Sequence, residues 1–293
     1  MREEKRLPLA VLGGDLRQCA LCAMLSEKGY RIKSFGLEKA GELKGEKCAS
    51  IRQAAQGAYA FVLPIPLERE ERYLNAPLAV EQLKTEYALS FLPKDALVFS
   101  GAIRQKTQEM MEQSGLRVID CLSKEDVVMT NADITAECAI GLAMAETQKT
   151  LNGSSVLIVG NGRIGKFLAY KLRALGARVA VSARKERDFA YIEAMGGKAL
   201  HTQGLTDNLK GFDVIFNTVP HLVLDRQQLA GMDMDALVID LASAPGGVNF
   251  TAAKEAGIRA IHALALPGKM APWSSAQAIM KAIVSTLNKE EEV

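Results

Sequence analysis

Residues 151–184, LNGSSVLIVGNGRIGKFLAYKLRALGARVAVSAR, give the clearest indication of the fold of this chain. They contain an apolar, β-branched run at 156–159, which is typical of a buried parallel strand. Three glycines follow in G-x-G-x-x-G spacing, and the apolar stripe after them predicts a helix that ends at Gly176. A second strand at 178–182 completes a β-α-β unit, the context in which this spacing indicates dinucleotide binding.

Each glycine of this turn has a physical reason. Gly160 permits the tight turn, Gly162 lets the backbone approach a pyrophosphate, and Gly165 lets the helix pack closely on the strand. A pyrophosphate would lie at the helix N-terminus, where free N–H groups and the helix dipole favour an anion. The alternative is a plain strand-to-helix turn that binds no ligand. The predicted cofactor-binding turn consists of Gly160, Asn161, Gly162, Arg163, Ile164 and Gly165.

The end of the second strand indicates which dinucleotide is bound. NAD-binding folds place an Asp or Glu about 20 residues past the glycines, where it holds the ribose 2′-hydroxyl. This chain has Ser182, Arg184 and Lys185 there, a hydroxyl and two cations that suit a 2′-phosphate. We therefore expect NADP as the cofactor, with NAD as the other possibility. The alternative is an ordinary solvated basic turn.

Length and composition bound the class of protein. A chain of 293 residues is long enough for two domains of typical size. Its 36 Lys and Arg and 34 Asp and Glu leave a net charge of +2, which gives no reason to expect nucleic acid or a membrane surface as a partner. The N-terminal segment has no signal-peptide apolar region, and no apolar run reaches the length of a membrane span. We expect a cytoplasmic protein.

Cysteine and histidine usage argues against disulfides and metal sites. Five cysteines are an odd number in a long chain, which does not suit a disulfide framework. Cys19 and Cys22 form a C-x-x-C, but no second pair follows at zinc spacing, so we interpret both as small buried residues. Three scattered histidines form no metal-ligand pattern, and no metal is expected.

The rest of the chain alternates predicted strands and helices, which implies parallel sheets with helices on both faces. In the first half we expect strands at 7–12, 31–35, 59–63, 96–99 and 117–120 and helices at 15–28, 48–56 and 104–114. The second half adds strands at 214–216, 237–241 and 260–264 and a final helix at 274–292. The predicted α/β fold has two doubly wound domains with an active cleft between them. A flavodoxin-like substrate-binding domain covers 1–130, with the C-terminal helix 276–293 packed back on it, and a Rossmann NADP-binding domain covers 131–275.

Between the two halves, the segment TNADITAECAIGLAMAETQKTLNG at 130–153 predicts one long helix. Thr135 and Glu137 would head it, and Asn152 and Gly153 would terminate it. A carboxylate in the first turn of a helix can serve as a general base at the cleft, or it can simply stabilise the helix dipole. Both interpretations of Glu137 stay open.

Candidate substrate ligands lie at the strand ends of the first domain, where parallel sheets bind their ligands. Gly13 and Gly14 precede a helix and would form an anion-binding turn, to which Arg17 adds a bidentate clamp for a carboxylate. In the alternative, Asp15 is only a helix N-cap and Arg17 lies on the surface. The predicted substrate-binding residues are Gly13, Gly14, Arg17, Ser100 and Thr135.

The strand ends of the second domain carry the remaining candidates. The predicted cofactor contacts beyond the glycine turn are Asn217, Thr218, Val219, Pro220, Ala242 and Pro267. A proton acceptor is also required, and the candidate catalytic residues are Lys269, Asp15, Glu137 and His221. Lys269 follows a Pro-Gly turn, so the simpler alternative for it is a solvated loop lysine.

These motifs resemble those of known families. The helix TAECAIGLAMAE together with residues 151–184 is similar to the D-2-hydroxyacid dehydrogenase superfamily and to adenosylhomocysteinase, a similarity shared by many enzymes. A narrower set of motifs resembles the dipicolinate synthase A-subunit family nearly end to end. That set is GGDLRQ at 13–18, NADITAECAI at 131–140, GNGRIGK, VSAR, NTVP, DLASAPGGVNF and ALPGKMAPWSSAQAI.

The second resemblance implies an oxidoreductase subunit that forms dipicolinate from dihydrodipicolinate, a branch of lysine biosynthesis, with a nicotinamide cofactor. A second, flavoprotein-like subunit is also implied, as is a place in the cytoplasm of the mother cell of a sporulating bacterium. We further expect a homo-oligomer and a dicarboxylate substrate. One alternative is a D-2-hydroxyacid dehydrogenase, although the strand end at 240–243 reads DLAS, without the Arg that such enzymes normally have there. The other is a nicotinamide-binding sensor or partner subunit without turnover.

Overall fold

The computed structural model describes residues 7–291, without the side chains of 206–208 and 291. The chain divides into two compact units. Unit 1 consists of Met1–Asn131 and Ala271–Val293, and unit 2 consists of Ala132–Met270. The chain passes from unit 1 to unit 2 within one long helix and returns to unit 1 just before the C-terminal helix.

Unit 1 is built on a six-stranded parallel sheet with the order β3-β2-β1-β4-β7-β8. The strands are β1 (Pro8–Leu12), β2 (Arg31–Phe35), β3 (Glu46–Lys47), β4 (Ala60–Val62), β7 (Leu97–Ser100) and β8 (Arg117–Asp120). Without the two-residue edge strand β3, the order is that of a flavodoxin-like sheet, as the sequence predicts. An antiparallel pair, β5 (Glu68–Glu70) and β6 (Tyr73–Leu74), is an addition that the sequence did not predict.

Helices cover both faces of this sheet. They are α1 (Leu16–Glu27), α2 (Ile51–Ala55), α3 (Thr85–Leu89), α4 (Gln105–Gln113), the 3-10 turn η1 (Cys121–Ser123) and α11 (Pro272–Glu291). Alternate residues of β1 enter different cores: Leu9 and Val11 pack with α1 and α11, whereas Leu12 packs with α2, α3 and α4. This alternation is the period-two side-chain pattern of a strand buried on both faces.

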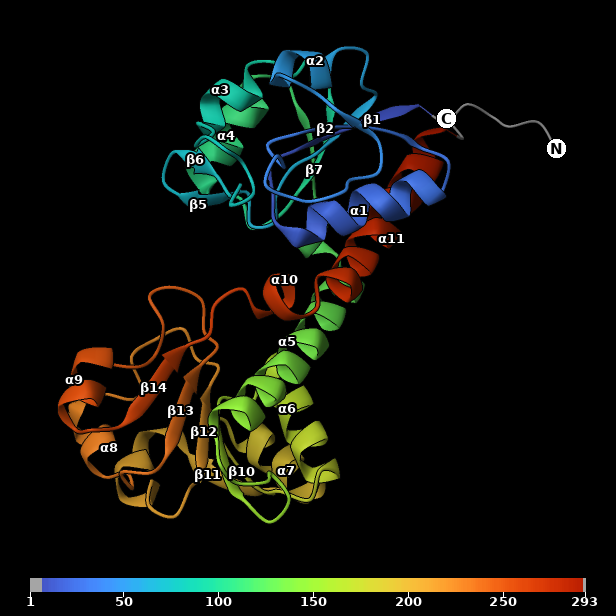
Figure 1. Cartoon of the computed structure of the whole chain (residues 1–293). Coiled ribbons are helices and arrows are strands. Elements are labelled where there is room, and N and C mark those ends of the chain that lie inside the picture. The colour runs from blue at the N-terminus through green and yellow to red at the C-terminus, as the bar shows by residue number, and fades with distance from the viewer. Residues whose placement is uncertain (1–6, 292–293) are drawn as a thin grey trace. The chain divides into compact units, whose positions relative to one another are not determined.

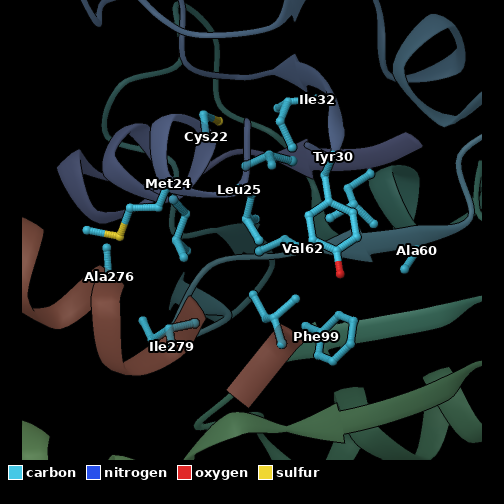
Figure 2. Close-up of a cluster of buried hydrophobic side chains, with 14 of the residues drawn as sticks. Cys22, Met24, Leu25, Tyr30, Ile32, Ala60, Val62, Phe99, Ala276 and Ile279 are labelled. Atoms are coloured by element: carbon cyan, nitrogen blue, oxygen red, sulfur yellow. The ribbon is translucent and has the colours of Figure 1, made fainter. Parts of the chain in front are cut away.

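The C-terminal helix α11 belongs to the core of unit 1. Its apolar stripe of Ile279, Ile283 and Leu287 is buried in the cluster that also contains residues of α1. Figure 2 shows Ala276 of α11 beside Met24 of α1. Each such aliphatic side chain contributes roughly 1.5–3 kcal/mol when it is fully buried. Burial of this stripe therefore anchors the end of the chain on unit 1.

Unit 2 has the six-stranded parallel order β11-β10-β9-β12-β13-β14, the 3-2-1-4-5-6 order of a Rossmann fold. Its strands are β9 (Ser155–Val159), β10 (Arg178–Ala183), β11 (Lys198–His201), β12 (Val214–Asn217), β13 (Leu237–Asp240) and β14 (Arg259–His262). The helical segments are α6 (Arg163–Ala174), α7 (Glu186–Ala194), η2 (Thr202–Asn208), α8 (Arg226–Ala230), α9 (Phe250–Glu255) and α10 (Leu266–Met270). Figure 1 shows α8 and α9 on one face of this sheet and α6 and α7 on the other. The predicted two-domain α/β class is confirmed.

The long helix α5 (Glu125–Glu146) differs from its prediction at both ends. It starts ten residues before Thr135 and ends before Asn152, because Glu125 and Asp126 already provide the acidic first turn of a helix. Its length and composition would also allow it to cross a membrane, but half of its most apolar 18-residue window is buried inside the protein. Core helices of soluble proteins meet the same test, so this is weak evidence for a span.

Candidate functional site

The glycine turn joins β9 to α6 and places a glycine at the start of the helix. Gly162 is the N-cap of α6, and no side chain caps it. A Cβ atom on Gly162 would meet nothing within 4 Å, so the space beside the turn is open. An open helix N-terminus attracts an anion. These features fit the pyrophosphate of a dinucleotide.

Gly160 and Gly165 lie where the backbone has no room for a side chain. Gly160 has a φ of +103°, which favours glycine, and a Cβ on it would lie 2.5 Å from Oγ1 of Thr218. A Cβ on Gly165 would overlap the carbonyl oxygen of Gly160. At Gly160 the turn after β12 leaves no room for a side chain, and at Gly165 the helix lies too close to the glycine turn for any other residue.

The turn that follows β12 lies beside the glycine turn, because β12 is the neighbour of β9 on the side opposite β10. The crevice at such a switch of strand order is where ligands of these sheets bind. The side chain of Asn217 is buried and bonds within the turn, donating to the carbonyl of Val219 (3.0 Å) and accepting from its N–H (3.1 Å). The hydroxyl of Thr218 donates to the carbonyl of Val159 (2.9 Å). Both side chains thus shape the turn, whereas Pro220 is exposed at its end.

Asp240, the last residue of β13, is a buried carboxylate that sequence reasoning missed as a site residue. It accepts hydrogen bonds from the Asn217 side chain (2.7 Å), from the Ala242 N–H (3.1 Å) and from the Gly247 N–H (2.9 Å). The available signal was an Asp at a strand end followed by a Pro-Gly-Gly turn. Ala242, a predicted cofactor contact, is buried, and its backbone N–H donates to the Asp240 carboxylate.

The end of β10 presents two cations. Arg184 and Lys185 are exposed, and α7 begins directly after them. Ser182, in contrast, has no exposed surface, and its hydroxyl accepts a hydrogen bond from Thr202 (3.3 Å). A 2′-phosphate at this strand end would therefore meet the two cations rather than the serine hydroxyl. Nearby, Asn161 of the glycine turn donates to Asp188 of α7 at 3.5 Å.

In unit 1, Asp15 and Arg17 bond to each other. Asp15 is the N-cap of α1, with a capping box to Gln18. Its carboxylate also receives Nε (3.0 Å) and Nη2 (2.8 Å) of the Arg17 guanidinium. Arg17 is only 7% exposed, so the alternative that places it on the surface is wrong. The N-cap half of that alternative is confirmed for Asp15.

The other predicted substrate ligands of unit 1 are covered by their surroundings. Gly13 and Gly14 are buried, and a Cβ on Gly13 would lie 3.0 Å from the Cβ of Ala76. The hydroxyl of Ser100 has no exposed surface and donates to the carbonyl of Pro64 (2.8 Å). The segment from Pro64 to Ala76 thus covers this edge of the sheet.

Glu137 is not in the first turn of its helix, because α5 begins twelve residues earlier. The helix-dipole interpretation of this residue is therefore wrong. Its side chain is exposed and pairs with Lys171 of α6 (3.1 Å), which also pairs with Asp133 (3.0 Å). Burial lowers the pKa of Lys171, but the hydrogen bonds with Asp133 and Glu137 outweigh burial and raise this pKa overall. Thr135, two residues earlier, is buried.

Two candidate catalytic side chains of unit 2 are exposed. His221 directly follows Pro220 at the carboxyl end of the sheet. Lys269 lies in the short helix α10, so its assignment to a loop is wrong, and Pro267 of the same helix is buried. Within residues 7–291, neither the His221 nor the Lys269 side chain forms a hydrogen bond or an ion pair with another residue.

The cysteines of the described chain are all free thiols. Burial raises the pKa of Cys22 and of Cys121 to about 12, so both stay protonated at neutral pH. Among residues 7–291, no group of three or more His, Cys, Asp or Glu side chains is arranged to hold a metal ion.

Comparison with known families matches each half of the chain to a different family model. Residues 8–122 match the N-terminal domain of the dipicolinate synthase A subunit. Residues 139–248 match the D-isomer specific 2-hydroxyacid dehydrogenase, NAD binding domain. The second match contains the glycine turn, the end of β10 and both turns around Asp240. It assigns a nicotinamide-binding fold to unit 2.

Single relatives match almost the whole chain. The A subunit of dipicolinate synthase from Bacillus subtilis (strain 168) is 32% identical over 288 residues, which cover 97% of this chain and 96% of the relative. The crystal structure of the same subunit from Bacillus halodurans is similar with a TM-score of 0.85 at 30% identity, covering 96% of this chain and 97% of that one. The dipicolinate synthase A chain structure from Bacillus subtilis gives a TM-score of 0.83 at 30% identity, with coverage of 98% and 97%.

Proposed function

Because this chain belongs to the dipicolinate synthase A-subunit family, we propose that it oxidises dihydrodipicolinate to dipicolinate with a nicotinamide cofactor. The observation that carries this proposal is an open glycine turn at a Rossmann switch point, in a chain that aligns with the family over nearly its full length. The fold of unit 2 supports the coarser class, an NAD(P)-dependent oxidoreductase.

The cofactor would bind along the carboxyl edge of the unit 2 sheet. Its pyrophosphate would lie on the N–H groups that start α6, beside Gly162 and the neighbouring residues of the turn. Its nicotinamide end would reach the turn at 217–220. We propose NADP as the cofactor because Arg184 and Lys185 are exposed at the end of β10 without a carboxylate at that position. Ser182 would act only by supporting the strand end.

The reaction removes one hydride and one proton from the dihydropyridine ring, which then becomes aromatic. When bound, the nicotinamide supplies the acceptor for the hydride. The protein must hold the ring against this acceptor and must take the proton through a side chain. It must also hold two carboxylates, which requires cations or N–H groups around the substrate.

Of the four proton acceptors suggested by the sequence, we propose Lys269 or His221. Asp15 is bonded by Arg17 and by the start of α1, and Glu137 is paired with Lys171. The side chains of Lys269 and His221 are exposed and belong to the same unit as the nicotinamide-binding turns. Replacing Lys269 by Ala should lower turnover and leave NADP affinity unchanged, because the residue is not part of the glycine turn.

For the substrate carboxylates, we propose Arg17. The N–H of Gly13 already donates to the carbonyl of Phe35 (2.7 Å), and Gly14 is buried beside it, so we propose that these two glycines shape the turn before α1 instead. Asp15 holds the guanidinium through Nε and Nη2 and leaves Nη1 without a protein partner in the described structure. A guanidinium oriented in this way can offer its remaining N–H groups to a second carboxylate. Ser100 of unit 1 is buried and bonds to the carbonyl of Pro64, so we propose that it stabilises unit 1 and does not contact the substrate. Thr135 of unit 2 is buried as well, so we propose a supporting role for it within unit 2.

The family name also bears on partners. The name of the relatives specifies one subunit of a synthase, which implies that a subunit of another kind exists. We propose that this chain works with a second, flavoprotein-like subunit in the mother cell of a sporulating bacterium and that it forms a homo-oligomer.

One assay separates the three functional hypotheses. The purified chain is mixed with dihydrodipicolinate and NADP, with and without the second subunit, and dipicolinate and NADPH are followed by absorbance. Dipicolinate formation supports the proposal. Turnover of D-2-hydroxyacids instead would support the dehydrogenase alternative, whereas cofactor binding without any turnover, even with the partner, would support a sensor or inert subunit.

A further inference from the structure

A buried carboxylate without a cation lies under the nicotinamide end of the proposed cofactor site. Asp240 has no exposed surface, and within the described residues no Lys, Arg or His pairs with it. A buried charge of this kind is costly unless hydrogen bonds compensate it. Asp240 has three such bonds, all from N–H donors, with donor–acceptor distances of 2.7–3.1 Å.

The three bonds connect two separate turns. Oδ1 accepts from the side chain of Asn217, the last residue of β12, and from the N–H of Ala242, which follows β13. Oδ2 accepts from the N–H of Gly247, at the end of the Pro-Gly-Gly turn. Asp240 therefore fixes the distance between the turn after β12 and the turn after β13.

The contacts continue from Asp240 to the glycine turn. Asn217 uses its remaining hydrogen-bonding groups on Val219 and thereby sets the conformation of the turn at 217–219. Within that turn, the Thr218 hydroxyl donates a hydrogen bond to the carbonyl of Val159 at the end of β9. The same hydroxyl lies 2.5 Å from the position of a Cβ on Gly160. A change at Asp240 would thus be transmitted through Asn217 to the wall of the cofactor crevice.

Two glycines of the Pro-Gly-Gly turn lie close to Asp240 and Asn217 on the other side. Gly246 has a φ of +87°, and a Cβ on it would lie 2.8 Å from Oδ2 of Asp240. A Cβ on Gly247 would overlap the Asn217 amide and the carbonyl of Val219. The Pro-Gly-Gly turn therefore lies directly against the turn after β12, with Asp240 bonded to both.

We propose that Asp240 is a positioning residue for the nicotinamide end of the cofactor. It holds the turns after β12 and β13 at a fixed spacing and does not itself touch the cofactor. The adenine end is held elsewhere, at the glycine turn and the end of β10, so Asp240 should affect only one end of the dinucleotide. This inference rests on the proposed function, because it requires that the crevice binds a nicotinamide dinucleotide.

The test compares two ligands on the variant Asp240→Asn. NADPH carries both ends of the cofactor, whereas 2′-phospho-ADP-ribose lacks the nicotinamide ring. An Asn side chain has the same shape, but one of its two polar atoms becomes an N–H₂ group that faces an N–H donor. The variant should weaken NADPH binding about tenfold, equivalent to roughly 1.4 kcal/mol, while 2′-phospho-ADP-ribose should bind nearly as tightly as to the wild type.

The matched control is Asp213→Asn, the same substitution just before the amino end of β12. The Asp213 carboxylate also accepts a backbone hydrogen bond, from Ser155 (2.8 Å), and it pairs with Lys149 (2.7 Å). The control should lower thermal stability without changing the affinity ratio of the two ligands. A purely structural role for Asp240 would give the same result as this control.

A second variant changes Asn217, the partner of Asp240 in this hydrogen bond. Asn217→Ser removes the donor to Asp240 and should show the same selective loss of NADPH affinity. Equal losses for both ligands, or no loss, would overturn the inference while the proposed function stands. Failure of both variants to fold would also overturn it, since Asp240 would then serve the fold. If the wild type binds neither ligand, the proposed function itself fails.

Discussion

Substituting Gly165 by Ala tests the close contact between α6 and the strand it follows. A Cβ at this position would overlap the carbonyl oxygen of Gly160 and would lie 3.5 Å from Cγ2 of Ile158. The obstacle is backbone, which cannot rotate away as a side chain can. The helix must therefore move outward, and its N-terminal N–H groups move with it.

The cost can be estimated from this geometry. Overpacking of a filled interior costs about 1–3 kcal/mol. For a unit of this size, that corresponds to a fall in melting temperature of about 3–10 °C. Because the displaced helix carries the proposed pyrophosphate site, NADPH affinity should fall as well.

Substituting Gly162 by Ala is the matched comparison. A Cβ at Gly162 meets nothing within 4 Å, and its φ of −77° and ψ of −168° suit any residue. Stability should change by less than about 1 kcal/mol, since Ala is only a poorer N-cap than Gly. The methyl group would nevertheless occupy the space of the pyrophosphate, so NADPH should bind at least about tenfold more weakly.

Thermal unfolding and NADPH fluorescence titration of the two variants provide the assay. We expect Gly165→Ala to lose both stability and affinity and Gly162→Ala to lose affinity only. If Gly162→Ala binds NADPH as tightly as the wild type, the backbone of the turn does not approach a pyrophosphate. If Gly165→Ala is as stable as the wild type, the tight packing of α6 does not explain why residue 165 is a glycine.

Three further predictions concern charged side chains. Arg184→Ala should weaken NADP binding and barely affect NAD, because only the 2′-phosphate loses a partner; equal losses in titrations with both cofactors would assign Arg184 to the fold. Arg17→Lys should cost about 1–3 kcal/mol of stability in denaturant unfolding, because an ammonium cannot replace the bidentate contact with the Asp15 carboxylate; unchanged stability would contradict the importance of this contact. A hydrogen bond from Lys149 lowers the pKa of Asp213. The stability that this carboxylate adds is therefore present at neutral pH and is lost as the pH falls through its folded-state pKa, below about 4. The difference in melting temperature between the wild type and Asp213→Asn should therefore shrink from pH 7 to pH 3, and a constant difference would count against it.

Local patterns were enough to predict most of the fold. The run at 156–159, the glycine spacing and the second strand each have a meaning that depends only on neighbouring residues. The stripe of Ile279, Ile283 and Leu287 likewise indicated a helix with one buried face, and all three residues are buried. The edges of α5 were mispredicted because Glu125 and Asp126 lie outside the apolar run that suggested the helix.

The geometry of the candidate site depends on hydrogen bonds between side chains, and the sequence does not reveal these bonds. Asp15 and Arg17 are two residues apart, yet nothing in the sequence shows that Asp15 itself takes the guanidinium in a buried position. Asn217 and Asp240 are 23 residues apart and meet only because β12 and β13 are neighbours in register. A polar residue at a strand end can bind a ligand or shape a turn, and only its hydrogen bonds distinguish the two.

Transfer of ring deuterium to the cofactor tests whether a hydride passes from dihydrodipicolinate to the nicotinamide. Dihydrodipicolinate deuterated on its ring carbons is oxidised with NADP by the chain and its second subunit, and the NADPH formed is analysed by mass spectrometry. Direct hydride transfer predicts NADPH that is heavier by one mass unit and is formed in equal amount to dipicolinate. Dipicolinate formed without NADPH, or NADPH without deuterium, would contradict direct hydride transfer from the ring to the nicotinamide.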